Sequence, residues 1–474
     1  SLAHTNRTGF NDTRNTNSNY FMQTRNLLWG LYWPTDYKTG EPWTARYASL
    51  AQNLLYYNDL WENSSKNLKI SVSETATVKF TDWLNARTVF SYDDTRVRDH
   101  IYFSPQHFSG SSTNGSVSEM STNYSKLVSS TTLNFNKSFD KHNVSALVGF
   151  EAERNKTDFM RSTGEDLPVN ALHTVYTAGT LDANAYDWGY TMLSILSRAE
   201  YNYADRYYVS GSYRRDGSSR LGEAKRWGNF WSVAGSWRIS NEAFMQNAPA
   251  ISNLRLRGSY GVNGTLPSSN YGWRSLASYG NKYQGAPGGA LANAADSNLS
   301  WETSYTTNVA LEFGFFKQRL TGSVEYFNRD SKDLLQDVPI SYVTGFSSTL
   351  KNIGMINNHG FEVELAGDII QTDNFRWSLG VNASFLKSKV VKLYDGADII
   401  WYDPTGDDDR AKFIYREGES TLAFYGREWA GVEKETGANL WYSNNDNKDT
   451  QVGGRNVVYD YNDADEVIIG NAIP

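Results

Sequence analysis

Apolar and polar side chains alternate strictly along Trp231–Ile239, close to the middle of the chain. The odd positions carry Trp, Val, Gly, Trp and Ile, and the even positions between them carry Ser, Ala, Ser and Arg. Successive side chains of a β-strand point to opposite faces of its sheet, so the pattern predicts a strand with one apolar and one polar face. The class of the fold depends on whether the apolar face contacts a protein core or a lipid bilayer.

The same alternation recurs along the chain. Short polar turns near Asp82, Asp140, Asp205, Lys317 and Asp373 join some segments, and long polar stretches join the others. This predicts successive hairpins with tight turns on one side and long loops on the other, in about a dozen strands, which is more than an ordinary soluble sheet contains. The predicted strands are Leu84–Tyr92, Thr131–Phe135, Val144–Ala152, Leu193–Tyr203, Tyr207–Tyr213, Trp231–Ile239, Leu254–Val262, Tyr305–Phe315, Leu320–Asn328, Phe361–Gly367 and Phe375–Phe385.

Composition helps to choose between the two environments. The 474 residues include 14% aromatic residues, and the mean hydropathy is −0.57. The sequence contains no apolar run near the ~18 residues that a spanning helix needs, so insertion into a membrane requires a β-barrel. Trp231 and Trp237 are separated by ~20 Å along a strand, which spans much of the ~25 Å apolar band of an outer-membrane barrel. We predict an all-β fold, a transmembrane antiparallel β-barrel, with a soluble β-sandwich or propeller as the alternative.

The barrel prediction assigns each alternating position to lipid or to the lumen. Charged residues repeat on the polar face, which is unusual for a sheet that is buried on both sides. The positions predicted to contact lipid are Val233, Leu256, Val309, Leu311, Val324, Leu379 and Val381. The positions predicted to face the lumen are Arg198, Arg255, Arg257, Asn308, Glu312, Glu325 and Glu364.

Sequence motifs for catalysis or metal binding are weak. Ser-x-x-Lys occurs three times, at Ser138, Ser348 and Ser384, but Lys38-Thr39-Gly40 precedes all three and Ser-Asp-Asn is absent. The chain has no cysteine, and its six histidines form no His-x-x-x-His pair. The oxygen-rich runs 407–409 and 445–449 lack the glycine and glutamate of an EF-hand. We predict no enzyme, no cofactor and no metal site, and the net charge of −7 argues against nucleic-acid binding.

Aromatic residues in or beside the long polar segments are candidate ligand contacts. A tryptophan or tyrosine there can belong to an aromatic girdle, pack within a loop, or offer a flat amphipathic surface to a ligand. The candidate substrate-binding residues are Trp188, Tyr271, Trp273, Trp301, Trp401 and Tyr402.

Ten blocks of the chain stand in an order and with residues that are recognisable together. They are Arg215–Arg220, Arg226–Phe230, Trp237–Ser240, Leu254–Gly261, Leu299–Glu302, Asn352–Gly354, Asn357–Glu362, Phe424–Gly426, Gly431–Val432 and Ile468–Asn471. These blocks resemble the SusC/RagA type of TonB-dependent transporter. The resemblance covers about residues 190–474, and the first 190 residues match only loosely.

The resemblance implies a 22-stranded barrel with a plug in its lumen, in the outer membrane of a Gram-negative bacterium. It also implies TonB-energised import of oligosaccharides or peptides with a SusD-like surface lipoprotein as partner, and contact with outer-membrane lipid. Residues 1–474 are then expected to be part of one barrel, with the plug, TonB box and last strands outside this sequence. A passive porin or other structural barrel is the alternative, followed by a secreted glycan hydrolase on a β-scaffold, which needs two carboxylates ~5–10 Å apart.

Overall fold

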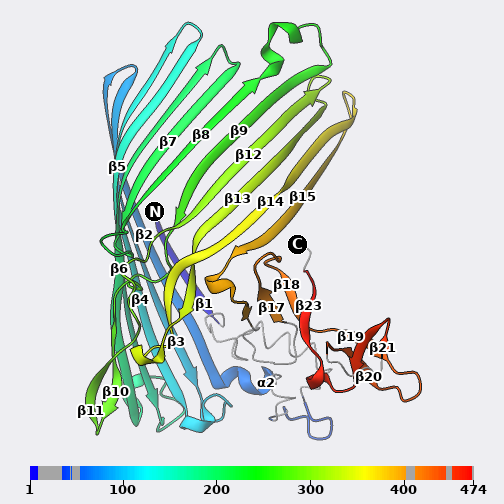
Figure 1. Ribbon diagram of the computed structural model, residues 1–474. Coiled ribbons are helices and arrows are strands. Elements are labelled where there is room, and N and C mark those ends of the chain that lie inside the picture. Colours follow the sequence, from blue (N-terminus) through cyan, green and yellow to red (C-terminus); the bar gives the residue numbers. More distant parts are fainter. Residues whose placement is uncertain (9–34, 43, 45–53, 402–411, 445–450, 472–474) are drawn as a thin grey trace. The chain divides into compact units, whose positions relative to one another are not determined.

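The computed structural model describes residues 1–8, 35–42, 44, 54–401, 412–444 and 451–471. Its main element is a 13-stranded sheet in which strands that follow one another in the chain are neighbours, apart from the β10–β11 excursion (Figure 1). Contacts divide the chain into two compact units. Unit 1 comprises residues 1–79, 85–132 and 150–193, and unit 2 comprises residues 80–84, 133–149 and 194–474. The sheet consists of β1 Leu2–Thr8, β2 Trp61–Thr81, β3 Leu84–Phe103, β4 Ser116–Phe139, β5 His142–Glu165, β6 Thr180–Tyr203, β7 Tyr207–Ser218, β8 Trp227–Arg238, β9 Ile251–Thr265, β12 Glu302–Phe315, β13 Leu320–Pro339, β14 Ser348–Gln371 and β15 Arg376–Lys392.

The five predicted tight turns are confirmed, and all of them belong to unit 2. They are residues 82–83, 140–141, 204–206, 316–319 and 372–375. Asp140 and Asp205 adopt left-handed backbone angles, with φ of 50° and 54°, which a short aspartate side chain tolerates in a turn. In a meander every second connection lies at the same edge. The five turns therefore share one edge of the sheet with the longer connection from β8 to β9, residues 239–250, and the remaining connections lie at the other edge.

Most strands are longer than predicted. The strand expected at Val144–Ala152 extends over the 24 residues of β5, and the polar stretch expected after Tyr92 is the second half of β3 and the first half of β4. Two strands are shorter than predicted at one end, β8 because Ile239 begins a 3₁₀ turn and β15 because Phe375 belongs to the preceding turn. Alternation marks only those residues that have an apolar face to bury, whereas a strand that continues into water can be polar on both faces. The prediction therefore detected the apolar part of each strand and missed the rest.

The strand register separates apolar from polar residues as predicted. Leu256, Leu311 and Val324 lie directly opposite one another on β9, β12 and β13, and so do Arg255, Glu312 and Ser323 on the other face. By the same register all seven positions predicted to contact lipid share one face. The predicted lumen positions on β9 and on β12 to β14 share the opposite face. A one-residue shift of register would mix the two sets, so the pattern fixes the pairing.

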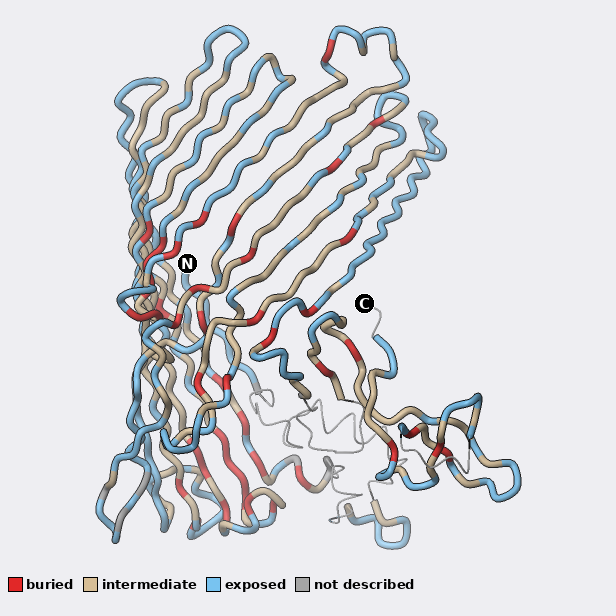
Figure 2. Tube along the Cα trace, in the orientation of Figure 1, coloured by how far each residue is buried: buried red, intermediate tan, exposed pale blue. Residues whose placement is uncertain are grey.

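Buried residues gather in unit 1 near the end of β3 and the start of β4 (Figure 2). One cluster contains Trp61, Ile101 and Phe103, and a second contains Tyr102, Val117 and Leu167. Leu167 belongs to the connection between β5 and β6, so this connection folds back onto the ends of the strands. Burial of such side chains contributes about 1.5–3 kcal/mol each.

Smaller elements complete the described chain. The hairpin formed by β10 Ala277–Tyr283 and β11 Ala286–Leu291 lies within the connection from β9 to β12. Two four-stranded sheets follow β15, in the orders β16-β17-β18-β23 and β19-β20-β22-β21. In the described residues the helices, including α2 Leu54–Tyr57, are short, and none has the length and apolar character needed to cross a membrane. The bounds are β16 Ile399–Trp401, β17 Lys412–Tyr415, β18 Ala423–Arg427, β19 Trp429–Val432, β20 Asn439–Tyr442, β21 Gln451–Val452, β22 Arg455–Val458 and β23 Glu466–Asn471.

Candidate functional site

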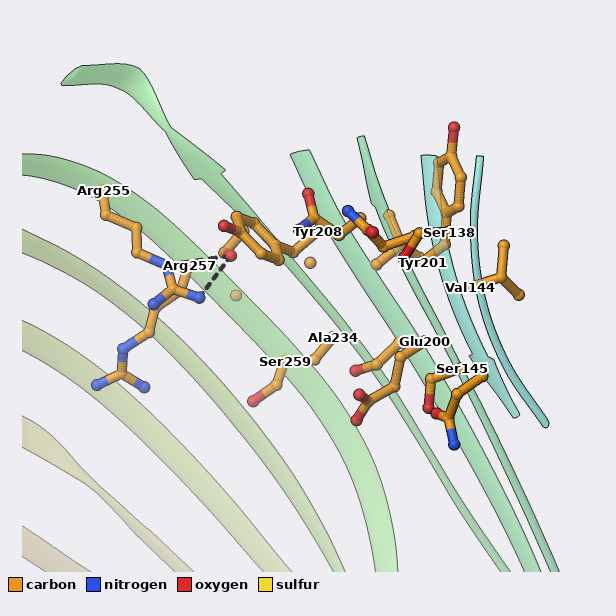
Figure 3. A pocket seen from close by; sticks show the side chains of 18 of the residues that line it. Ser138, Val144, Ser145, Glu200, Tyr201, Tyr208, Ala234, Arg255, Arg257 and Ser259 are labelled. Carbon is orange, nitrogen blue, oxygen red and sulfur yellow. Dashed lines mark hydrogen bonds between the residues drawn. The ribbon is translucent and has the colours of Figure 1, made fainter. Parts of the chain in front are cut away.

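The polar face of unit 2 contains a concavity of about 680 Å³. It is lined by residues of β4 to β9 and of β12, near the edge that carries the tight turns. Figure 3 shows Arg255 and Arg257 on one side of it, Glu200 on the other, and Tyr208 between them. Serine and asparagine side chains supply much of the remaining lining, so the surface suits a polar occupant.

An ion-pair network lies beside the concavity. Arg257 donates from Nε to Glu312 Oε1 at 2.8 Å and from Nη2 to Glu325 Oε2 at 2.5 Å. The network joins β9, β12 and β13, and its members are 55 and 68 residues apart in sequence. These side chains are partly exposed, so the network contributes modestly to stability and mainly fixes the positions of its charges.

The predicted lumen residues outside this network are placed as follows. Arg198 contacts Glu200 two positions along β6, and Asn308 on β12 lines the concavity. Glu364 lies opposite Ser323 and Asn382, and its neighbour on the same face, Glu362, lies opposite Glu325. The structure thus brings all but Glu364 to the concavity or the network beside it. Contact of these residues with a lumen stays a prediction.

Three of the segments with recognisable sequence blocks meet at the other edge of unit 2. Trp301 is 7% exposed, its ring packs edge-to-face on Phe230, and its Nε1 donates to the carbonyl oxygen of Arg226 at 3.1 Å. Gly264 is needed beside this pair, because a Cβ there would lie 2.1 Å from the Phe230 ring. Trp301 is therefore a packing side chain, and we do not include it in the proposed ligand surface.

The side-chain amide of Asn352 connects two segments at the same edge. Its Oδ1 accepts the backbone N–H of Ser300 at 2.8 Å, and its Nδ2 donates to the carbonyl oxygens of Ser300 and Asp333 at 3.0 and 2.8 Å. One side chain thus satisfies backbone groups of the connection before β12 and of strand β13, which explains why an asparagine stands there. A second hollow, of about 840 Å³, lies around it and is lined by polar residues that include Lys225 and Lys351.

Trp273 is the predicted ligand contact that the structure places most favourably. It lies in the connection from β9 to β12 and is half-buried. Its Nε1 donates to the carbonyl oxygen of Ser219 at 3.1 Å, and the Arg274 guanidinium lies 4.5 Å from its ring centroid. The hydrogen bond fixes the indole plane while part of the ring stays accessible. Tyr271 lies two residues earlier and is also half-buried.

The other aromatic candidates are placed differently. Trp188 lies within β6, in unit 1, and stacks on Tyr186 with ring centroids 5.4 Å apart, so its predicted loop location is wrong. This part of β6 carries polar residues on both faces, so alternation of apolar and polar residues does not reveal it as a strand. Trp401 is the last residue of β16, and Tyr402 lies outside the described residues.

The connection between β8 and β9 is tied to the strands by Glu242. Trp237 donates from Nε1 to Glu242 Oε1 at 3.0 Å, and Arg206 Nη1 lies 3.4 Å from Glu242 Oε2. Hydrogen bonds from Tyr207 and Trp237 lower the pKa of the Glu242 carboxyl, since they stabilise its charged form. A carboxylate at this position anchors the aromatic residues beside the tight-turn edge, where Tyr207 stacks on Trp237.

Two of the dispersed histidines meet in unit 1. Glu62 contacts His100 at 3.2 Å and His173 at 2.9 Å, and His100 also contacts Glu119 at 2.8 Å. These residues come from β2, β3, β4 and the connection after β5, and no sequence signal connects them. Within the described residues, no group of three or more such side chains has the arrangement of a metal site.

Comparisons with known proteins identify the family of the chain. The model for the β-barrel of TonB-dependent receptor-like proteins matches residues 3–471. The chain belongs to the TonB-dependent receptor family. It is 30% identical over 400 residues to TonB-dependent receptor P39 of Formosa agariphila, covering 82% of this chain and 37% of that protein. It is 31% identical over 280 residues to TonB-dependent receptor SusC of Bacteroides thetaiotaomicron, covering 57% and 28%.

Solved structures agree with the assignment to the SusC/RagA type of TonB-dependent receptor. A chain of the RagAB peptide transporter superimposes with a TM-score of 0.78 and 26% identity, over 92% of this chain and 48% of that one. The RagAB peptide importer in its open-open state gives the same TM-score at 25% identity. The chain thus spans about half or less of the length of the receptors it matches.

The family confirms three predictions. The fold is a β-barrel of the TonB-dependent type, the location is the outer membrane of a Gram-negative bacterium, and the family consists of receptors and not of enzymes. Three of the receptor blocks found in the sequence meet around Trp301 and Asn352, namely Arg226–Phe230, Leu299–Glu302 and Asn352–Gly354. Their contacts hold the connection from β9 to β12 against the neighbouring strands.

Proposed function

We propose that the chain forms part of the wall of an outer-membrane importer of oligosaccharides or peptides that is energised by TonB and works with a SusD-like surface lipoprotein. The observation that carries the proposal is the superposition on the RagAB peptide transporter over 92% of the chain. The similarity to SusC supports the same type of receptor. The coverage of those proteins is partial, so substrate, energy source and partner are parts of the proposal.

The two faces of the sheet suit a transporter wall. The apolar face exposes Val, Leu and aromatic side chains, which suits lipid, and the polar face carries the concavity and the ion-pair network. A wall of this kind keeps a polar passage apart from the bilayer. At the long-connection edge, the half-buried ring of Trp273 and the hollow around Asn352 offer an aromatic surface and hydrogen-bonding groups. Such a combination suits sugar rings or peptide side chains.

An uptake assay tests the proposal. A strain that lacks the complete receptor is complemented with it and supplied with labelled peptide or oligosaccharide mixtures, with and without a protonophore. We expect receptor-dependent uptake of one of the two classes and its loss when the proton-motive force is dissipated. Uptake that persists with the protonophore would assign the barrel to passive diffusion.

Replacing Trp273 by alanine should reduce that uptake severalfold and leave surface display unchanged. The ring supplies one face of the proposed ligand surface, and a contact of the size of an aromatic pair contributes about 0.5–1.5 kcal/mol. Trp429→Ala is the matched control, because its indole is 55% exposed in a separate small sheet. Equal uptake by the Trp273 variant and the control would place Trp273 among the packing residues.

The orientation of the sheet is a separate prediction. We expect the long connections to face the cell exterior and the tight turns to face the periplasm, as in outer-membrane barrels. A protease site inserted between Gln284 and Gly285, at the tip of the β10–β11 hairpin, should be cut in intact cells. A site inserted after Lys317 should be cut only after the outer membrane is opened. The reverse result would invert the topology.

A further inference from the structure

Two arginines of unit 2 face each other across neighbouring strands. Arg238 on β8 is directly opposite Arg255 on β9, and both belong to the polar face. Like charges at directly opposite positions of an antiparallel pair destabilise the sheet. An arrangement that destabilises the fold locally requires a stabilising interaction elsewhere, and such unfavourable arrangements are concentrated at functional sites.

The described residues offer these guanidinium groups little compensation. Arg255 donates from Nε and Nη2 to the hydroxyl of Ser236 at 3.1 and 2.8 Å, and the nearest carboxylate in an ion pair with it, Glu312, is 4.0 Å away. Arg238 has no hydrogen bond from its side chain and no ion pair within the described part of the chain, and its Nε is buried. The neighbouring carboxylates have other partners. Glu312 and Glu325 bind Arg257, Glu200 contacts Arg198, and Glu242 contacts Arg206 and Trp237.

Tyr208 holds the two guanidinium groups around one ring. The Cζ of Arg255 lies 5.4 Å from the ring centroid and the Cζ of Arg238 lies 6.0 Å from it. Cation–π contact at this range is weakly attractive and orients an arginine without using its N–H donors. The free donors of Arg238 are therefore positioned beside a concavity that Tyr208, Ser236 and Arg255 line.

We propose that Arg238 and Arg255, arranged around Tyr208, form a binding site for a carboxylate. Two guanidinium forks provide the charge and the paired N–H donors that carboxylates prefer. One anion between them removes the repulsion across β8 and β9. The carboxylate belongs either to a soluble ligand or to an acidic side chain of a protein segment that occupies the concavity. The inference rests on contacts within unit 2 and is independent of the proposed import function.

The test uses the complete receptor purified in a neutral detergent, with succinate as the probe. Its unfolding temperature is measured in sodium succinate and in sodium chloride of equal ionic strength, for the wild type, Arg238→Gln and Arg255→Gln. Lys282→Gln is the charge-matched control, because Lys282 is exposed on the β10–β11 hairpin. If a glutamine variant does not fold, lysine is placed at the same position instead, since lysine keeps the positive charge and lacks the paired N–H donors of a guanidinium group.

Two outcomes support the site and identify the source of its anion. If the site is open to soluble ligands, succinate raises the unfolding temperature of the wild type. Each arginine variant then needs about tenfold more succinate, or more, for half of that effect, as loss of one charge-assisted hydrogen bond predicts. If an acidic side chain fills it, succinate has no effect, and each arginine variant lowers the unfolding temperature in chloride while the control does not.

Two other outcomes overturn the proposal. The first is a higher unfolding temperature of either arginine variant in chloride, because relief of an uncompensated repulsion produces that result. The second is a pair of arginine variants that match the control both in chloride and in succinate. Neither result changes what the uptake assay of the receptor measures, so failure of this site is distinguishable from failure of the proposed import function.

Discussion

Replacing Val309 by arginine should destabilise the folded receptor by about 2–4 kcal/mol, the cost of a charged side chain on the lipid face near the bilayer midplane. Val309 is 47% exposed on the apolar face, between Gly258 of β9 and Tyr326 of β13. If this face contacts lipid, an arginine there must carry its charge into hydrocarbon. The change in free energy is measured by urea-dependent folding into lipid vesicles.

Asn308→Arg is the matched control for this prediction. Asn308 precedes Val309 on the same strand, points to the polar face and lines the concavity of unit 2. The same new side chain meets polar groups there, so we expect a small change in stability. Similar losses at the two positions would mean that both faces are buried in protein, and would contradict contact of the apolar face with lipid.

Replacing Trp301 by alanine should cost about 3–5 kcal/mol, the usual range for removing a large buried aromatic side chain. The indole is 7% exposed, packs on Phe230 and satisfies the carbonyl group of Arg226, so its loss leaves a cavity and an unpaired acceptor. The same folding measurement in vesicles detects the change.

The outcome also distinguishes the two roles that the sequence allowed for Trp301. Trp429→Ala, at a 55% exposed position, should change stability little. A Trp301 variant of wild-type stability with impaired uptake would restore Trp301 as a ligand contact. A strongly destabilised variant assigns it to the packing of the long connections.

Aromatic candidates illustrate how far loop residues can be interpreted from sequence. Trp273 and Trp301 both stand in polar segments, yet one ring is half-buried beside Arg274 and the other is enclosed by Phe230 and Gly264. A tryptophan in a polar stretch carries no local sign of its burial, because the residues that cover it come from other strands. Trp188 shows the same limit, since its strand is polar where it extends beyond the apolar part.

The sequence alone determined the all-β class, the tight turns and the division of residues between two faces. These properties are local, because a period of two along each strand decides which residues share a face. It did not determine the full length of the strands, since alternation ends where the apolar face ends.

Only the tertiary structure decided which distant residues meet. Arg257 and Glu325 are 68 residues apart, and Glu62 and His173 are 111 apart, so pairing of the strands creates their contacts. The opposition of Arg238 and Arg255 likewise depends on the register of β8 and β9, which the length of the connection between them does not fix. Local pattern specifies faces, and strand pairing specifies neighbours, because hydrogen bonds between strands set the positions along them.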